Sequence, residues 1–506
     1  MATANIQQTI LRAEGIPQNK EIRFRANVGG TIDIPTGRWH HGEYGESIMN
    51  GGVTLYEGVS GKANNFKTTI VADFVAIILE RYTNMQSSCT WSDQEETSDM
   101  GRIASIIVQK KGFDVFADDP MAIYDLGYIT VTDKGSMPSN KWWEGIRNFV
   151  DVKVKNKSLM MDSEFADRHG KPISFLLPSV SVIDSISELE GEDVMAIRDK
   201  TEIGQKEANM LYMHQGRGKD RLIREAQTVA SRGNHFMLMT AQWGEDKADI
   251  GASPMSGPKA KKMNTIRQGE KIRGVPDSFL YLPQHVWLIN GSENLKDDSR
   301  SNAEFPLDFD SSVENLDLWR CPTSMIRSKT GLSAFSLDLI VSQKRGFQPT
   351  LTEFFNIFRR KKRYGIDGAG QHYSLDLYPE LKLQRTEIRT KIDTDPLLRR
   401  AINITSEISQ IGDYDVHWSS RIPTMKDLRK KLEADGYDWN ILSRHVDGLP
   451  LKSSNLSVTL SSAPWTFLRC TITSTHLTGS KPIRKQSRKN SARYLNLKQP
   501  RKLPIC

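Results

Sequence analysis

Cysteine is scarce in this chain of 506 residues, and the few cysteines stand far apart. They are Cys89, Cys321, Cys470 and Cys506, and no two of them form a C-x-x-C pair. Zinc ribbons and disulfide scaffolds need closely spaced or paired cysteines, so neither is supported. A reducing, cytoplasmic setting fits this usage best.

Long apolar runs are also missing. No stretch of about 18 uncharged apolar residues occurs, which argues against a transmembrane helix. The first residues, MATANIQQTILRAEG, lack the basic-then-apolar order of a secretory signal. We therefore expect a soluble protein with no membrane partner.

Acidic residues are absent from the last part of the chain. Of the 69 Lys and Arg residues, 11 lie after Pro450, where no Asp or Glu occurs. Residues 1–450 therefore hold 58 basic and 61 acidic residues. The body is thus nearly neutral, and its charge alone is weak evidence for a nucleic-acid partner. The basic tail is either a solvated segment or an auxiliary DNA-binding arm.

The order of patterns along the chain predicts an α/β fold with a mostly parallel sheet, because strand-like runs alternate with helical ones. Those runs are 53–58, 179–184, 235–242, 285–291 and 336–342. Helical patterns follow at 350–358 and 395–404. We expect four parts: an N-terminal segment with a short helix at 6–13 (1–35), an α/β core (36–345), a smaller, mainly helical domain (346–450) and the basic, Ser/Thr-rich tail (451–506).

The most informative segment is VTLYEGVSGKANNFKTTIVADFVAIILERY, residues 53–82. A strand enters a Gly/Ser/Asn loop that opens a helix, which is the context of a phosphate-binding loop. Backbone N–H groups at such a helix start attract anions. Lys62 lies too early in the loop, whereas Lys67 precedes Thr68 where the helix begins. Phe66 replaces the usual second glycine, and a Gly/Asn-rich surface turn is the alternative.

Acidic residues follow two other strands. Asp184 ends the run SVSVID, where it could hold Mg²⁺ through water or simply cap a helix. Asp93, Glu95 and Glu96 follow SSCTW, where one of them could orient an attacking water or all could form an acidic loop. Parallel-sheet ligands bind at the carboxyl ends of strands, so these elements together predict one nucleotide site.

These motifs resemble those of RecA-type recombinases, and more closely those of the bacteriophage UvsX branch, which is similar in carrying Phe in the position of Phe66. The order from the loop to CTWSDQE (89–95), SVIDS (181–185) and MTAQ (239–242) is also similar. The resemblance covers about residues 20 to 410. It implies a RecA-like P-loop ATPase core, an N-terminal segment for oligomerisation and, if the chain is phage-encoded, the cytoplasm of the host cell.

The resemblance also implies roles for individual residues. Lys67 and Thr68 would hold the phosphates and Mg²⁺. Asp184 would be the Walker B acid and, with Thr68, would bind the metal. Glu95 would activate water, with Glu96 as the fallback, and Gln242 would sense the γ-phosphate and couple ATP to a DNA loop. Without the resemblance, Gln242 is an ordinary polar residue at a strand end. The full set expected to contact the nucleotide is Gly61, Lys62, Ala63, Asn64, Asn65, Phe66, Lys67, Thr68, Thr69, Arg327 and Lys329.

Two segments would then contact DNA: 187–205, after Asp184, and 243–276, after Gln242. The second is rich in Gly, Ser and Pro and is too long for an ordinary connection. Clustered basic side chains suit a phosphate backbone without sequence readout, although a plain surface loop is the alternative. Its basic residues are Lys259, Lys261, Lys262, Arg267, Lys271 and Arg273.

The segment IRSKTG (326–331) resembles the family's basic motif that reaches the ATP of a neighbouring subunit, although a solvated turn is equally compatible. This carries Arg327 and Lys329 over as trans contacts. The basic tail departs from the branch, which tends to end in acidic residues.

The sequence therefore predicts an ATP-dependent DNA recombinase, using ATP and Mg²⁺, that forms helical filaments on single-stranded DNA and exchanges strands with duplex DNA. Single-strand-binding and mediator proteins are possible partners. Two alternatives remain open. One is a replicative helicase of the DnaB type, which shares the RecA core but carries a longer domain ahead of it. The other is a non-catalytic, single-stranded DNA-binding mediator with a decayed loop.

Overall fold

A computed structural model describes the fold of most of the chain. The residues described are 39–41, 47–49, 53–110, 112–166, 172–200, 207–245, 263, 265–266, 270–300, 302–307, 316–328, 335–359, 365–369, 372–414, 424–434, 450–453 and 456–459. The expected helix at 6–13 and most of the basic tail lie outside them.

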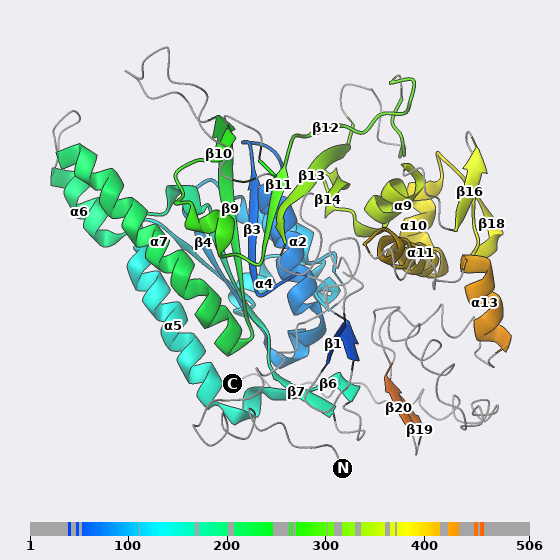
Figure 1. The fold of residues 1–506 in the computed structure, drawn as a ribbon, viewed down its shortest axis with the longest axis horizontal. Helices are drawn as coiled ribbons and strands as arrows, with labels where there is room; N and C mark the ends of the chain where they lie inside the picture. The colour runs from blue at the N-terminus through cyan, green and yellow to red at the C-terminus, as the bar shows by residue number, and fades with distance from the viewer. Residues whose placement is uncertain are drawn as a thin grey trace, which may run out of the picture.

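One large sheet runs through the centre of the molecule (Figure 1). In spatial order its strands are β15 (Gly346–Phe347), β14 (Phe335–Ser342), β13 (Leu318–Ser328), β11 (His285–Ile289), β3 (Tyr56–Gly61), β9 (His235–Glu245), β8 (Ser179–Asp184), β4 (Cys89–Asp93) and β5 (Ile129–Asp133). Two further strands join it, β10 (Glu270–Ile272) beside β9 and β12 (Glu293–Asn294) beside β13.

The six strands from β11 to β5 are parallel to one another. The pairings of β10, β12, β13, β14 and β15 are antiparallel. The protein is therefore α/β with a large, mostly parallel mixed sheet, which confirms the fold class at that level. All five predicted strand runs lie in this sheet. The sheet also contains β5 and β13, which the sequence pattern did not single out as strands.

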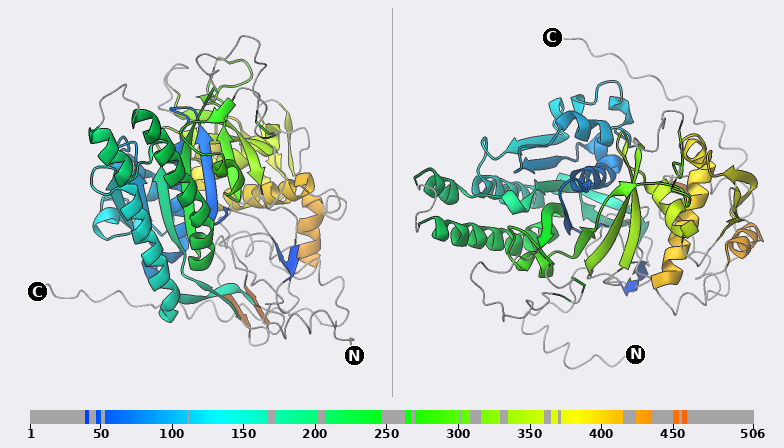
Figure 2. Two further views of the ribbon diagram at one scale, coloured as in Figure 1. Left: turned by 60° about the vertical axis from the view of Figure 1, so that its left-hand side comes forward. Right: turned by 90° about the horizontal axis from the view of Figure 1, so that it is seen from above.

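Helices cover both faces of the parallel strands. On one face α2 (Lys67–Leu79) packs against β3, β8 and β9 and against α3 (Met100–Ile107). On the other face α7 (Glu207–Gly233) packs against β3 and β9 and against α5 (Ser139–Lys155) and α6 (Glu192–Lys200) (Figure 2). The fold is therefore a three-layer sandwich, in which the sheet is shielded from water on both sides.

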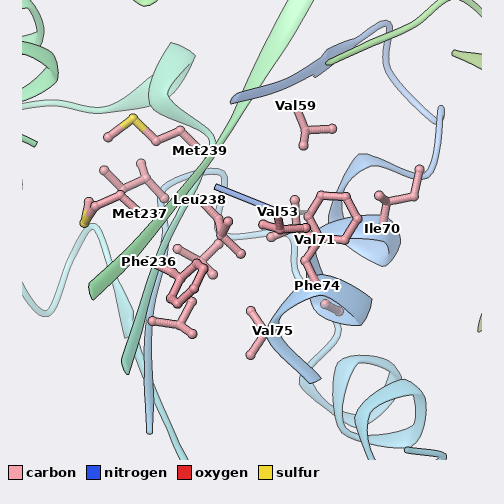
Figure 3. Close-up of a cluster of buried hydrophobic side chains, with 14 of the residues drawn as sticks. Val53, Val59, Ile70, Val71, Phe74, Val75, Phe236, Met237, Leu238 and Met239 are labelled. Atoms are coloured by element: carbon pink, nitrogen blue, oxygen red, sulfur yellow. The ribbon is translucent and has the colours of Figure 1, made fainter. Parts of the chain in front are cut away.

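Alternation along β9 shows how the layers are joined. Phe236 and Leu238 point toward α2, whereas Met237 and Met239 point to the opposite face of the sheet (Figure 3). All four side chains are fully buried. A strand with apolar side chains on both faces is what a sheet covered by two helical layers requires. The α2 side chains that meet them are Val71, Phe74 and Val75.

A second hydrophobic cluster lies beyond β14, on the right in Figure 1. It uses Leu318 and Ile340 of the main sheet, so the two cores share β13 and β14. Its helices are α9 (Pro349–Arg359), α10 (Ile388–Thr394), α11 (Pro396–Tyr414) and α13 (Met425–Ala434). A three-stranded antiparallel sheet accompanies them, made of β16 (Ile366–Ala369), β17 (His372–Leu375) and β18 (Tyr378–Gln384).

The remaining described elements are short. Three strand pairs lie apart from the main sheet: β1 (Trp39–His41) with β2 (Ser47–Met49), β6 (Met160–Ala166) with β7 (Pro172–Leu176), and β19 (Pro450–Ser453) with β20 (Leu456–Thr459). The short helices are η2 (Glu80–Met85), η3 (Asp114–Phe116), α4 (Ala122–Asp125), η4 (Lys157–Leu159), η5 (Ile186–Glu188) and α8 (Ser278–Tyr281). Across the described ranges, no helix combines the length and apolarity that crossing a bilayer would take.

A buried ion pair fastens the second cluster to the sheet. Arg389 of α10 donates to the carboxylate of Asp317, which precedes β13, and both side chains are 2% exposed. Asp317 also accepts hydrogen bonds from the Ser342 hydroxyl at 2.7 Å and from the Lys344 backbone N–H at 3.0 Å. These partners hold the pKa of Asp317 below its usual value despite its burial.

We expect Arg389→Met to destabilise the protein strongly, because it leaves the charge of Asp317 buried without its cation. The cost should be about 3 kcal/mol, at the low end for a broken buried pair. Urea unfolding measures it. As the control, Arg221→Met breaks an exposed pair with Glu225 on α7 and should leave the unfolding midpoint unchanged. Equal midpoints for both variants would contradict the assigned role of Arg389.

Candidate nucleotide site

The carboxyl ends of the parallel strands meet at one edge of the sheet. Gly61 at the end of β3 lies opposite Gln242 of β9, and Asp93 at the end of β4 lies opposite Asp184 of β8. Because parallel strands all present their carboxyl ends at the same edge, side chains from distant parts of the sequence converge there.

The loop between β3 and α2 is held against the neighbouring strand. The Asn65 side chain donates to the backbone oxygen of Ile289 at 3.3 Å and accepts from the Ser292 hydroxyl at 3.1 Å. A Cβ added to Gly61 would lie 3.2 Å from the same Ile289 oxygen, so glycine permits this close approach. Lys62, Ala63 and Asn64 form the exposed rim of the loop.

Phe66 occupies the last position of the loop in a left-handed conformation. Its φ is 57° and its ψ is 22°, and its backbone oxygen accepts the first helical hydrogen bond, from Ile70 at 3.0 Å. Such a backbone favours glycine and is strained for a bulky residue. The ring contacts Trp319 of β13, with the centroids 5.8 Å apart. Packing of the ring thus offsets the strain of the backbone.

Lys67, the first residue of α2, turns back over the loop. Its Nζ donates to the backbone oxygen of Lys62 at 2.8 Å. Burial lowers the pKa of this ammonium group, and the charges of Glu95 and Asp184 oppose that shift. Of the two lysines considered from the sequence, Lys67 is therefore the one that faces the acidic groups, whereas Lys62 is exposed.

Asp184 connects three elements. Its carboxylate accepts from the Thr68 hydroxyl of α2 at 2.7 Å and from the Thr240 hydroxyl of β9. Burial raises the pKa of Asp184, the two hydroxyls lower it, and the nearby Glu95 and Asp93 raise it further. The side chain is 4% exposed. Its hydrogen bonds go to α2 and β9, so they do not make it the helix cap that the sequence left open.

The three acidic residues after β4 have different surroundings. Asp93 accepts from the backbone N–H groups of Glu96 and Ser98, each at 3.0 Å, and so shapes its own turn. Glu95 is partly buried and its Oε1 accepts from Nε2 of Gln242 at 3.2 Å. Glu96 is exposed. The structure therefore places Glu95, and not Glu96, beside Gln242.

The segment expected to be a long loop after Gln242 begins and ends as a hairpin. β9 continues to Glu245 and pairs with β10, so that Ile272 lies opposite Trp243 and Lys271 opposite Gly244. Trp243 and Ile272 are both buried. The glycine and charged residues around them hide this two-stranded pattern in the sequence. Lys271 therefore lies on a strand.

The other expected DNA contacts have mixed placements. Arg273 follows β10 with an exposed side chain that packs over Gly244, where an added Cβ would lie 2.0 Å from its Nε. In the first segment, 187–205, η5 and α6 replace much of the expected loop. The basic residues that lie outside the described parts of the chain are Lys259, Lys261, Lys262, Arg267 and Lys329.

Arg327 lies away from the loop of its own chain. It is on β13 opposite Val286, and Val286 lies opposite Gly58, three residues before Gly61. At about 3.3 Å per residue, Arg327 lies roughly 10 Å before the carboxyl end of β3 when measured along the strand direction, and β11 separates the two strands. Its Nε donates to the backbone oxygen of Pro283 at 2.9 Å. A contact with a neighbouring subunit stays a prediction.

Sequence reasoning missed two residues of this site. Thr240 is a hydroxyl inside the apolar run 235–242, and this exception in a buried strand is a signal that could have found it. Ser187 gives no such signal, because its hydroxyl is recognised only through its contacts. It accepts from the Gln242 backbone N–H and donates to the Arg273 oxygen, each at 2.9 Å.

The donor set fits a magnesium–triphosphate group. The helix start of α2 and the Lys67 ammonium group supply positive potential for phosphate oxygens. A hydroxyl and a carboxylate, Thr68 and Asp184, supply the hard oxygen atoms that Mg²⁺ prefers. Comparison with protein-family models and with curated proteins gives no match.

We expect Phe66→Gly to be more stable than Phe66→Ala. Both variants lose the ring contact with Trp319, but only glycine adopts a positive φ without cost. The difference should be about 1 kcal/mol, which reverses the usual order of the two residues near a helix. Urea unfolding of the two variants measures it. Alanine equal to or better than glycine would show that the loop does not hold Phe66 in the left-handed region.

Proposed function

We propose that the protein is an ATP-dependent DNA recombinase with a RecA-like P-loop ATPase core. It would polymerise on single-stranded DNA, pair that strand with homologous duplex DNA and exchange strands. The convergence of Lys67, Thr68, Asp184 and Glu95 at one edge of the sheet carries this proposal. These residues come from α2, β8 and the end of β4, and their meeting at one point is what an ATP-hydrolysing site needs.

The chemistry is phosphoryl transfer to water. Lys67 would neutralise β- and γ-phosphate oxygens, and the loop from Gly61 to Thr69 would surround the phosphates with backbone N–H groups. When bound, Mg²⁺ supplies charge that draws electron density from the phosphoryl group, and Thr68 and Asp184 would hold it. Glu95 would accept a proton from the attacking water as the general base.

Gln242 supports the proposed coupling of ATP to DNA. Its side chain contacts Glu95, and the strand that carries it continues into the β9–β10 hairpin. A nucleotide that bound the Gln242 amide in place of Glu95 would therefore change the position of that hairpin and of the basic segment between its strands.

The proposed filament accounts for Arg327, which lies away from its own phosphate loop. In a filament it would approach the nucleotide of the next copy, together with Lys329. Single-strand-binding and mediator proteins are proposed as partners of loading.

We expect Lys67→Ala to abolish ATP turnover stimulated by single-stranded DNA and to weaken nucleotide binding, because it removes the charge that faces the phosphates. Glu95→Gln should lower turnover by about 10²–10⁴-fold while nucleotide binding remains, because it removes only the base. Lys141→Ala removes an exposed lysine on α5, is the matched control and should keep turnover. Unchanged turnover in Lys67→Ala would refute the site.

Electron microscopy with DNA and ATP separates the proposal from its rivals. Helical filaments are the expected result, whereas hexameric rings would indicate a replicative helicase. Wild-type protein that binds single-stranded DNA without measurable ATP binding would indicate a mediator with a decayed loop.

A further inference from the structure

A junction of hydrogen bonds lies beside Gln242 on the β8 side of β9, whereas the proposed phosphate loop follows β3 on the other side of β9. Ser187 is its centre: the hydroxyl accepts from the Gln242 backbone N–H and donates to the Arg273 oxygen, each at 2.9 Å. The Arg273 N–H in turn donates to the Gln242 oxygen at 2.8 Å. One buried hydroxyl thus joins the first residue of one proposed DNA segment to the stem of the other.

Lys219 of α7 connects the two segments at this junction. Its Nζ donates to the backbone oxygens of Ser187 at 2.6 Å and Gly274 at 2.7 Å. The side chain is 3% exposed, yet it reaches past the helix surface to bind two carbonyl groups. Burial lowers the pKa of Lys219 to about 8, while Glu188 and Glu190 oppose the shift and Lys134 adds to it.

Gly274 shows that the junction requires close approach. Its φ is +63°, and an added Cβ would lie 2.8 Å from the Ser187 oxygen. A residue other than glycine would be strained by its backbone and would also push Ser187 away. The contact between the two segments therefore depends on local chain geometry as well as on side chains.

We propose that Ser187 and Lys219 form the mechanical coupling between the nucleotide site and DNA binding, with Lys219 as a positioning residue. A shift of Gln242 cannot occur without moving its backbone partners, and Ser187 and Lys219 pass that shift to the stems of both segments at once. This inference rests on the proposed function of the site. It needs no contact of Lys219 with nucleotide or DNA.

The arrangement also explains why a lysine is buried here. Burying an ammonium group is costly unless it is hydrogen-bonded, and a methionine would fill similar volume without that cost. Two carbonyl groups from separate segments are the partners that compensate. An apolar side chain at position 219 that only filled space would need neither of these carbonyl groups.

The experiment compares the affinity for single-stranded DNA with and without a non-hydrolysable ATP analogue. The ratio of the two dissociation constants measures the coupling. If wild type gives a ratio of at least tenfold, Ser187→Ala and Lys219→Met should each bring it to within about twofold of unity. In Lys219→Met, DNA-independent turnover should stay within about twofold of wild type, because the Lys219 side chain binds the backbone oxygens of Ser187 and Gly274 rather than the residues proposed to hold the nucleotide. The double variant should be no worse than the worse single variant, since both act at one junction.

The matched controls are Ser105→Ala, which removes an exposed hydroxyl on α3, and Arg217→Met, which removes an exposed charge on α7. Both should keep the wild-type ratio. A wild-type ratio of one would overturn the proposed function itself. A coupled wild type with equally coupled variants would overturn only the junction, as would variants that lose analogue binding and DNA binding together. If Lys219→Met fails to fold, Ser187→Ala decides.

Discussion

The buried carboxylate of Asp184 is the interaction on which the site depends. It ends β8, and the hydroxyls of Thr68 and Thr240 donate to it from α2 and β9. A carboxylate at this depth is stable only with such partners, so its burial fixes where the helix begins relative to the sheet. The loop between Gly61 and α2 is then held at both ends. The position of Lys67 follows from this anchoring.

Much of the fold could be predicted from the sequence because its signals are local. Apolar runs such as 235–242 are long enough to indicate buried strands, and the change from strand to helix at 53–82 is visible in the residues themselves. β13 was missed because Arg320 and Pro322 interrupt its apolar pattern, and because its antiparallel pairing with β11 and β14 leaves no local mark. The three-stranded sheet of β16–β18 escaped for a similar reason, since polar residues fill its exposed face.

The candidate site was less accessible to sequence reasoning where it depends on contacts. The pattern named Asp184, Glu95 and Gln242 separately, but the bond between Gln242 and Glu95 joins residues 147 positions apart. Ser187 and Lys219 are ordinary residues until the chain folds. In the sequence, Phe66 only departs from a glycine motif. In the structure, its ring contacts Trp319, which is distant in the sequence, and a glycine at position 66 could not make this contact.

The extension of β9 beyond Gln242 has a mechanical consequence. Strand backbone is nearly inextensible, and β10 braces the last residues of β9 from Trp243 to Glu245. A displacement of Gln242 along the strand would therefore move Glu245 by nearly the same amount. If the proposed coupling holds, the distance between the nucleotide and the end of the hairpin is set by the length of one strand.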